Sequence, residues 1–170
     1  MLKEKVEKAL NEQINAEQYS ALLYLSMSAW FESKGLPGFA NWMYVQYQEE
    51  LTHANKIFKY VIDRDGEVRL KGIEQMPTEF DNVVEVVEKT LKHEQYVTSL
   101  IDKLVDIAVE ERDRATESFL KWFVDEQVEE EANVSEILDS LKLIEGKGNG
   151  LFMLDRELRQ RTFVDTTQAE

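Results

Sequence analysis

Residues 47–57 read YQEELTHANKI, and Glu50 and His53 in this stretch decide how the rest of the chain is interpreted. Because the two residues are three positions apart, a helix places both side chains on one face, one turn above the other. The residues on that face recur at steps of four and three: Phe39, Met43, Gln46, Glu50, His53, Ile57 and Tyr60. A carboxylate and an imidazole thus stand where a helix packed in a core normally carries leucine. This pair can hold a metal ion.

The composition is that of a folded globular protein. The chain has 170 residues, of which 43% are hydrophobic and 32% charged, and we predict a single domain over residues 1–170. A net charge of −14 argues against nucleic-acid binding, and such a surface either concentrates cations or simply keeps the protein soluble.

The chain has no cysteine, which excludes disulfides and thiolate metal sites. The start, MLKEKVEKAL, lacks an apolar signal core, and no apolar run could cross a membrane, so we expect a cytoplasmic protein.

Glycine and proline divide the chain into stretches rich in good helix formers. The first two helices are expected at about residues 5–33 and 38–64, joined by a tight turn in which Pro37 begins the second helix. Residues 78–145 would be too long as one rod, so we expect them to fold back near Glu110–Asp113, with Asp113 as an N-cap. This pattern predicts an all-α fold, a four-helix bundle over about 5–145 with a short fifth helix at about 151–163.

Residues 65–80 form the one long connection between these helices. Sixteen extended residues reach about 50 Å, whereas a helix of 27 residues is about 40 Å long. The connection can therefore cross over the length of the bundle and make the third helix parallel to the second. Val68 and Leu70 alternate with charged residues, which predicts an extended strap lying on apolar surface.

Each of the four expected helices carries one acidic residue within its apolar stripe. These residues are Glu17, Glu50, Glu94 and Glu130. Glu17 and His53 lie about 18 residues on either side of the first turn, and Glu94 and Gln127 lie about 16 or 17 residues on either side of the second. All these groups should therefore meet at one level of the core.

Four buried carboxylates cannot remain ionised without compensation, because burying each charge costs several kcal/mol. Either they are protonated or cations lie among them, and two divalent ions would balance four carboxylates. Oxygen ligands with a single imidazole favour iron or manganese, and zinc also fits. Glu50 would bridge the two ions if Glu17 and His53 hold one ion and the remaining two carboxylates hold the other.

At this point the sequence resembles the non-haem ferritins of the bacterial type over nearly its whole length. Four motifs carry the resemblance: NAEQYSALLYL (15–25), YQEELTHANKI (47–57), KTLKHEQYVTSLI (89–101) and FLKWFVDEQVEEEANV (119–134). The resemblance implies iron storage in a homomeric 24-chain shell and a ferroxidase centre that oxidises Fe(II) with O2 or peroxide.

The resemblance also assigns roles to residues. It implies one iron bound by Glu17, Glu50 and His53, and a second by Glu50, Glu94 and Glu130 with Gln127 beside it. A third site would use Glu49, Glu126 and Glu129, although these three residues alone look more like a solvated acidic face. Bacterioferritins, which are similar, carry a haem-ligating methionine at the position of Leu51, so we expect no haem.

Two neighbouring residues keep more than one interpretation. Tyr24 can hydrogen-bond a ligand, donate an electron or simply pack, and Gln46 can orient a ligand or fill space. Trp122 is expected to be a core aromatic, and His93 is expected at the surface because it is one position off the Glu94 face.

Two other functions remain open from the sequence. One is a di-iron oxidase or peroxidase that stores no iron, and the other is a structural bundle whose buried carboxylates are protonated.

Overall fold

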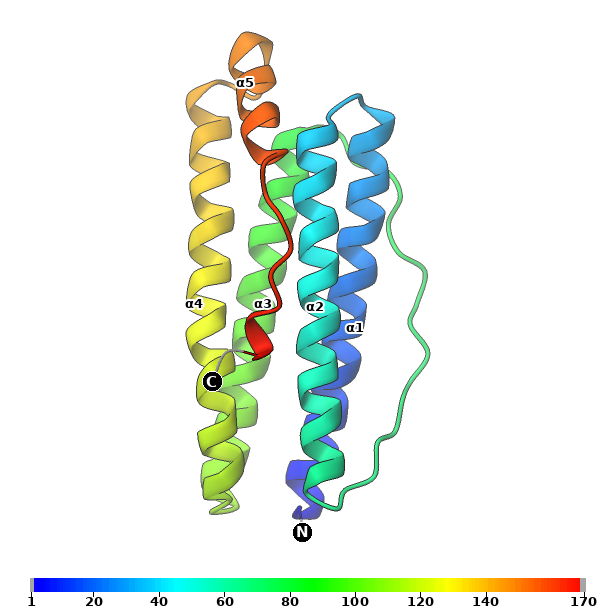
Figure 1. The fold of residues 1–170 in the computed structure, drawn as a ribbon, viewed down its shortest axis with the longest axis vertical. Coiled ribbons are helices and arrows are strands. Elements are labelled where there is room, and N and C mark those ends of the chain that lie inside the picture. Colours follow the sequence, from blue (N-terminus) through cyan, green and yellow to red (C-terminus); the bar gives the residue numbers. More distant parts are fainter. Residues whose placement is uncertain (1, 169–170) are drawn as a thin grey trace.

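The computed structural model describes residues 2–168, and this part of the chain contains helices and no strand. Four long helices form an elongated bundle (Figure 1): α1 Glu4–Ser33, α2 Pro37–Asp63, α3 Val83–Glu110 and α4 Arg114–Leu143. A short helix, α5 Gly148–Leu158, lies at one end of the bundle, and one 3₁₀ turn, η1 Thr166–Gln168, follows it. The predicted all-α bundle with a fifth helix is confirmed.

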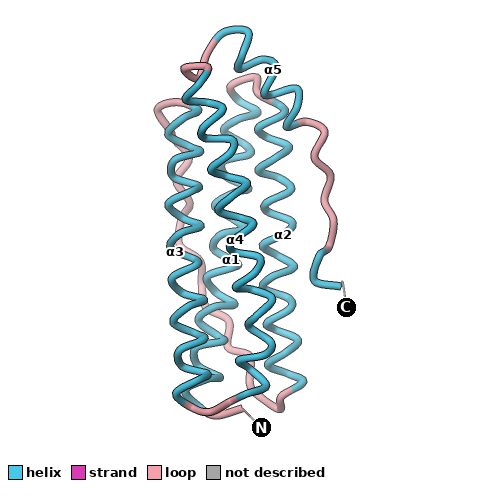
Figure 2. Tube along the Cα trace, turned by 90° about the vertical axis from the view of Figure 1, so that its left-hand side faces the viewer, coloured by secondary structure: helices cyan, strands magenta, loops and turns pink. Residues whose placement is uncertain are grey.

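The connection between α2 and α3 determines the topology. It runs along α1 from one end of the bundle to the other (Figures 1 and 2), so α2 and α3 are parallel while α1 and α4 run the opposite way. The side-chain amide of Asn11 donates to the carbonyl of Glu67 at 2.9 Å, and the Ser26 hydroxyl donates to the carbonyl of Pro77 at 2.6 Å. The expected crossover is thus confirmed, and α1 holds it in place.

The prediction that Val68 and Leu70 both lie on apolar surface was wrong for Leu70. Val68 packs half-buried against the core, whereas Leu70 is 62% exposed. Residues 66–81 adopt no regular secondary structure. Because no neighbouring strand imposes a two-residue repeat on this segment, alternation in the sequence does not fix which side chains face inward.

The helix ends follow the sequence signals closely, except in α5. Pro37 begins α2, and the Asp113 carboxylate accepts a hydrogen bond from the backbone N–H of Thr116 at 3.1 Å, so both predictions are confirmed. The fifth helix ends at Leu158 rather than near 163. The side-chain amide of Asn41 donates to the carbonyls of Leu158 and Arg161 at 3.3 and 2.9 Å, which gives these carbonyls partners outside a continuing helix.

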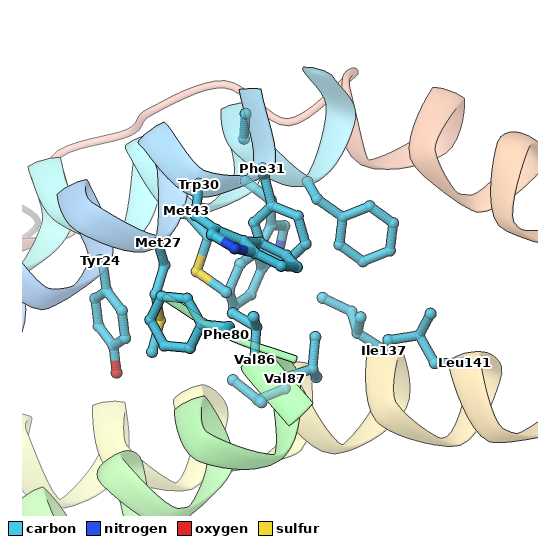
Figure 3. Packing of buried hydrophobic residues seen from close by; sticks show 14 of the residues in the cluster. Tyr24, Met27, Trp30, Phe31, Met43, Phe80, Val86, Val87, Ile137 and Leu141 are labelled. Atoms are coloured by element: carbon cyan, nitrogen blue, oxygen red, sulfur yellow. The ribbon is translucent and has the colours of Figure 1, made fainter. Parts of the chain in front are cut away.

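The apolar core is divided into two clusters. One lies toward the α1–α2 turn and contains Met27, Phe31 and Met43 among others (Figure 3). The other lies toward the opposite end and contains Leu10 and Ile57. The middle turns of all four helices fall between the clusters, and their inward positions are polar. A polar layer thus lies between the two hydrophobic clusters.

Candidate metal centre

The polar layer contains one buried carboxylate from each long helix. Glu17 from α1, Glu50 from α2 and Glu94 from α3 are each at most 1% exposed. Glu130 from α4 is 3% exposed, and His53, one turn after Glu50, is 1% exposed. The helical steps that placed these residues on inward stripes in the sequence thus bring all five into one layer of the core.

In the described part of the chain, two groups in and beside this layer are compact enough to hold a metal ion. Potential ligand atoms of Glu17, Glu50 and His53 all lie within 4.8 Å of one another, and so do those of His53, Glu126 and Glu130. The first group also has unused bonding capacity. Among the residues that the structure describes, Glu17 Oε2, Glu50 Oε2 and His53 Nε2 are buried without a hydrogen-bond partner. Buried polar atoms rarely lack a partner, so this layer fits a bound cation.

Amide side chains orient the carboxylates. Gln13 Nε2 donates to Glu17 Oε1 at 2.8 Å, and Gln46 Nε2 donates to Glu130 Oε2 at 2.8 Å. Of the two roles left open for Gln46, orienting a carboxylate is the one that the structure supports. The sequence gives no signal for the role of Gln13 beyond its place on the inward stripe of α1, four residues before Glu17.

Glu94 is held from two sides. The Tyr24 hydroxyl, which points from α1 toward α3 (Figure 3), donates to Glu94 Oε1, and Gln127 Nε2 donates to Glu94 Oε2 at 3.2 Å. Gln127 also donates to the carbonyl of Glu94 and to the Thr98 hydroxyl, each at 3.3 Å. Tyr24 therefore does more than pack, because it fixes the orientation of this carboxylate.

Burial dominates the electrostatics of the centre. It raises the pKa of Glu94 to about 8, and the charge of Glu130 adds to that increase. Burial likewise raises the pKa values of Glu50 and Glu130. For His53, burial alone would lower the pKa, but Glu126 and Glu50 outweigh it and raise the pKa well above its ordinary value. Without a metal, this centre therefore retains protons that a divalent cation would replace.

The three residues expected at a third site differ in position. Glu126 Oε1 lies 3.7 Å from His53 Nε2. Glu49 is half-buried beside it and forms an ion pair with Arg161 at 2.7 Å. Glu129 is exposed and belongs to neither of the compact groups found in the described part of the chain. Arg161 is a contact that the sequence did not indicate, because it lies 112 residues from Glu49 and outside the long helices.

The prediction that His93 lies at the surface was wrong. Its ring is half-buried, with Nε2 2.7 Å from the Ser20 hydroxyl and the centroid 5.8 Å from the rings of Tyr19 and Tyr24. Burial lowers the pKa of His93 to about 4. A position beside the inward stripe of α3 is covered because α1 packs against it.

Trp122 is half-buried rather than fully in the core, with its ring centroid 5.3 Å from that of His53.

Fold and site together define a four-helix-bundle protein with a carboxylate-rich candidate metal centre in its core. Residues 7–144 match the model of the ferritin-like domain family. The chain is 47% identical to the bacterial non-heme ferritin of Bacteroides fragilis, covering 95% of this chain and 100% of that protein. It is 42% identical to that of Campylobacter jejuni, covering 94% and 95%. This protein therefore belongs to the ferritin family.

Solved structures agree with this assignment. An engineered closed form of the Archaeoglobus fulgidus ferritin superposes with a TM-score of 0.95 at 49% identity, covering 96% of this chain and 100% of that one. The open-pore ferritin of the same archaeon superposes with a TM-score of 0.94 at 49% identity, covering 95% and 100%.

In the part of the chain that the structure describes, no helix is long and apolar enough to cross a membrane.

Proposed function

We propose that this ferritin stores iron by oxidising Fe(II) at the buried centre and depositing ferric oxyhydroxide inside a protein shell. The observation that carries the proposal is the convergence of four buried carboxylates and one histidine in one layer. Among the described residues, Glu17, Glu50 and His53 each keep a buried ligand atom without a hydrogen-bond partner. Two Fe(II) ions would each supply one electron to O2, with peroxide as a second candidate oxidant. The protein places two ions close together and limits other reactions.

Each ligand has an assigned place in this proposal. Glu17, Glu50 and His53 would bind the first Fe(II), and their mutual distances within 4.8 Å support this assignment. Glu50, Glu94 and Glu130 would bind the second, with Gln127 positioning Glu94 and with Glu50 shared. The centre is rich in hard oxygen donors, which suit Fe(II).

Three further residues would form a third iron site on the outer side of the centre. These residues are Glu49, Glu126 and Glu129. Leu51 is half-buried on the helix that carries Glu50 and offers no haem ligand, so the centre is proposed to work without haem.

We propose a cytoplasmic homomeric shell of 24 chains with no nucleic-acid or membrane partner. Leu143, Phe152 and Met153 are each at least 60% exposed near one end of the bundle, and contacts with other copies would cover them.

Aerobic Fe(II) loading followed by native mass measurement tests the proposal. We expect a particle of about 480 kDa, the mass of 24 chains of 19.9 kDa, with an electron-dense core. Anaerobic titration should give Fe(II) binding at the inner centre, which Glu50→Ala abolishes. A small oligomer that oxidises Fe(II) without forming mineral would instead identify a non-storing oxidase, and wild-type protein that binds no Fe(II) would identify a structural bundle.

A further inference from the structure

The segment after α5, residues 159–168, runs back along the bundle instead of leaving it. In Figure 1 it descends in red over the α2–α4 face, and Figure 2 shows it beside α2, ending near the middle of the bundle. That is the level of the polar layer, because the Thr166 hydroxyl donates a hydrogen bond to Glu126 Oε1 at 3.3 Å. The C-terminal segment therefore covers one flank of the metal centre.

Arg161 is the firmest contact of this segment. Its guanidinium donates to Glu49 Oε2 at 2.7 Å and to the carbonyl of Trp42 at 3.5 Å. It also lies over the Trp42 ring, 4.7 Å from the centroid. The side chains of Arg161 and Glu49 are only 21% and 14% exposed. A guanidinium held by an ion pair, a carbonyl and an aromatic face is fixed in place.

Two further contacts hold the segment against the centre. Besides the Thr166 contact with Glu126, the Lys56 ammonium donates to the carbonyl of Thr167 at 3.1 Å. Behind Glu126 lies His53 Nε2, at 3.7 Å, buried and without a hydrogen-bond partner among the described residues. The segment therefore contacts both outer carboxylates, Glu49 and Glu126, while a potential ligand atom faces them from inside.

We infer that Arg161 is a built-in counter-cation for Glu49, so that docking of segment 159–168 and binding of a divalent cation at the outer carboxylates compete. The inference rests on the proposed function, since it concerns the third position beside the ferroxidase centre. A guanidinium and a divalent ion sharing Glu49 would repel each other across a few ångströms of partly buried space. Such coupling is reciprocal: the docked segment weakens cation binding, and the bound cation loosens the segment by the same factor.

Anaerobic Fe(II) titration calorimetry on the assembled protein tests the first half of this coupling. In Arg161→Gln the outer position should bind Fe(II) at least about fivefold more tightly than in the wild type, the lower end of typical coupling factors, while the inner positions are unchanged. Arg159→Gln is the matched control, because it removes the same charge from an exposed side chain of the same segment. It should titrate like the wild type.

Hydrogen exchange on the wild-type protein tests the second half without any variant. Anaerobic Fe(II) above two equivalents per chain should accelerate amide exchange in residues 159–168, whereas two equivalents should not. Unchanged exchange would overturn the inference, as would equal tightening in the Arg159 and Arg161 variants. If two Fe(II) ions bind in a Glu50-dependent way but the outer position binds Fe(II) equally tightly in Arg161→Gln and the wild type, this inference is refuted and the proposed function stands. A wild-type protein that binds no Fe(II) would refute both it and the proposed function.

Discussion

Asp155 on α5 caps α2 at Gly38. Its Oδ1 accepts hydrogen bonds from the backbone N–H groups of Gly38 at 2.8 Å and Phe39 at 3.0 Å, and the carboxylate is 6% exposed. The first N–H groups of a helix have no partner within the helix. An acceptor from 117 residues away therefore caps α2 and fastens α5 to the bundle in one interaction.

Replacing Asp155 with Ala should loosen α5. The loss of a capping acceptor costs about 1 kcal/mol, and it leaves two buried N–H groups unpaired. We expect a lower melting temperature and faster hydrogen exchange in Gly148–Leu158, while the middle of α1 keeps its protection. Asp155→Asn retains an acceptor oxygen and should stay closer to the wild type. Equal protection of α5 in the wild type and Asp155→Ala would contradict the capping role.

Gly38 leaves no room for a side chain. A Cβ added there would lie 1.6 Å from the carbonyl oxygen of Asp155, so Gly38→Ala must push α5 away from α2. The variant should keep its bundle helicity by circular dichroism but assemble less completely in native mass measurements. Gly72→Ala is the control, since a Cβ there meets nothing within 4 Å among the described residues. If both variants assembled equally well, α5 docking would not matter for assembly.

Tyr24→Phe should weaken binding of the second Fe(II). The Tyr24 hydroxyl donates to Glu94, and this hydrogen bond acts to lower the pKa of that carboxyl against the larger effect of burial. Without it the Glu94 pKa should rise further above about 8, so Fe(II) must displace a more firmly held proton. We expect up to about tenfold weaker binding at pH 7, equivalent to about 1.4 kcal/mol, in anaerobic titrations.

Tyr19→Phe provides the comparison for this prediction. Tyr19 is half-buried on the same helix, whereas Tyr24 is fully buried, and it also lies against the His93 ring. It forms no hydrogen bond to Glu94 among the described residues. It should bind Fe(II) like the wild type. Unaltered affinity in Tyr24→Phe would show that its hydroxyl does not support the second site.

The metal-free protein should lose stability as the pH rises from about 5 to 8. Burial raises the pKa of Glu94 to about 8, so the folded state keeps a proton that the unfolded state releases near pH 4. The stabilisation is thus complete below the unfolded pKa and is lost as pH rises through the folded one, by at most about 1.4 kcal/mol per pH unit for one group.

Melting temperatures with a chelator present would measure this dependence. Glu94→Gln stays uncharged at every pH and should flatten the decline, and bound Fe(II) should reverse it because the metal replaces the protons. Identical slopes in Glu94→Gln and the wild type would show that Glu94 ionises freely in the core.

The sequence determined the four long helices and their inward faces. Steps of three and four residues placed Glu17, Glu50, Glu94 and Glu130 inside, because local periodicity fixes which side of a helix is apolar. Similar distances from the turns, which agree to within about one helical turn, then set their common level. The single long connection was enough to predict that α2 and α3 are parallel.

Only the tertiary structure decided which residues far apart in the chain meet. Arg161 beside Glu49, Asp155 at the start of α2 and the covered ring of His93 follow no period, since each depends on how one element lies on another. The end of α5 at Leu158 is of the same kind, because the Asn41 amide binds the carbonyls there. Helical periodicity is a local property that a sequence displays directly, whereas contacts across 73 to 120 residues exist only once the helices have packed.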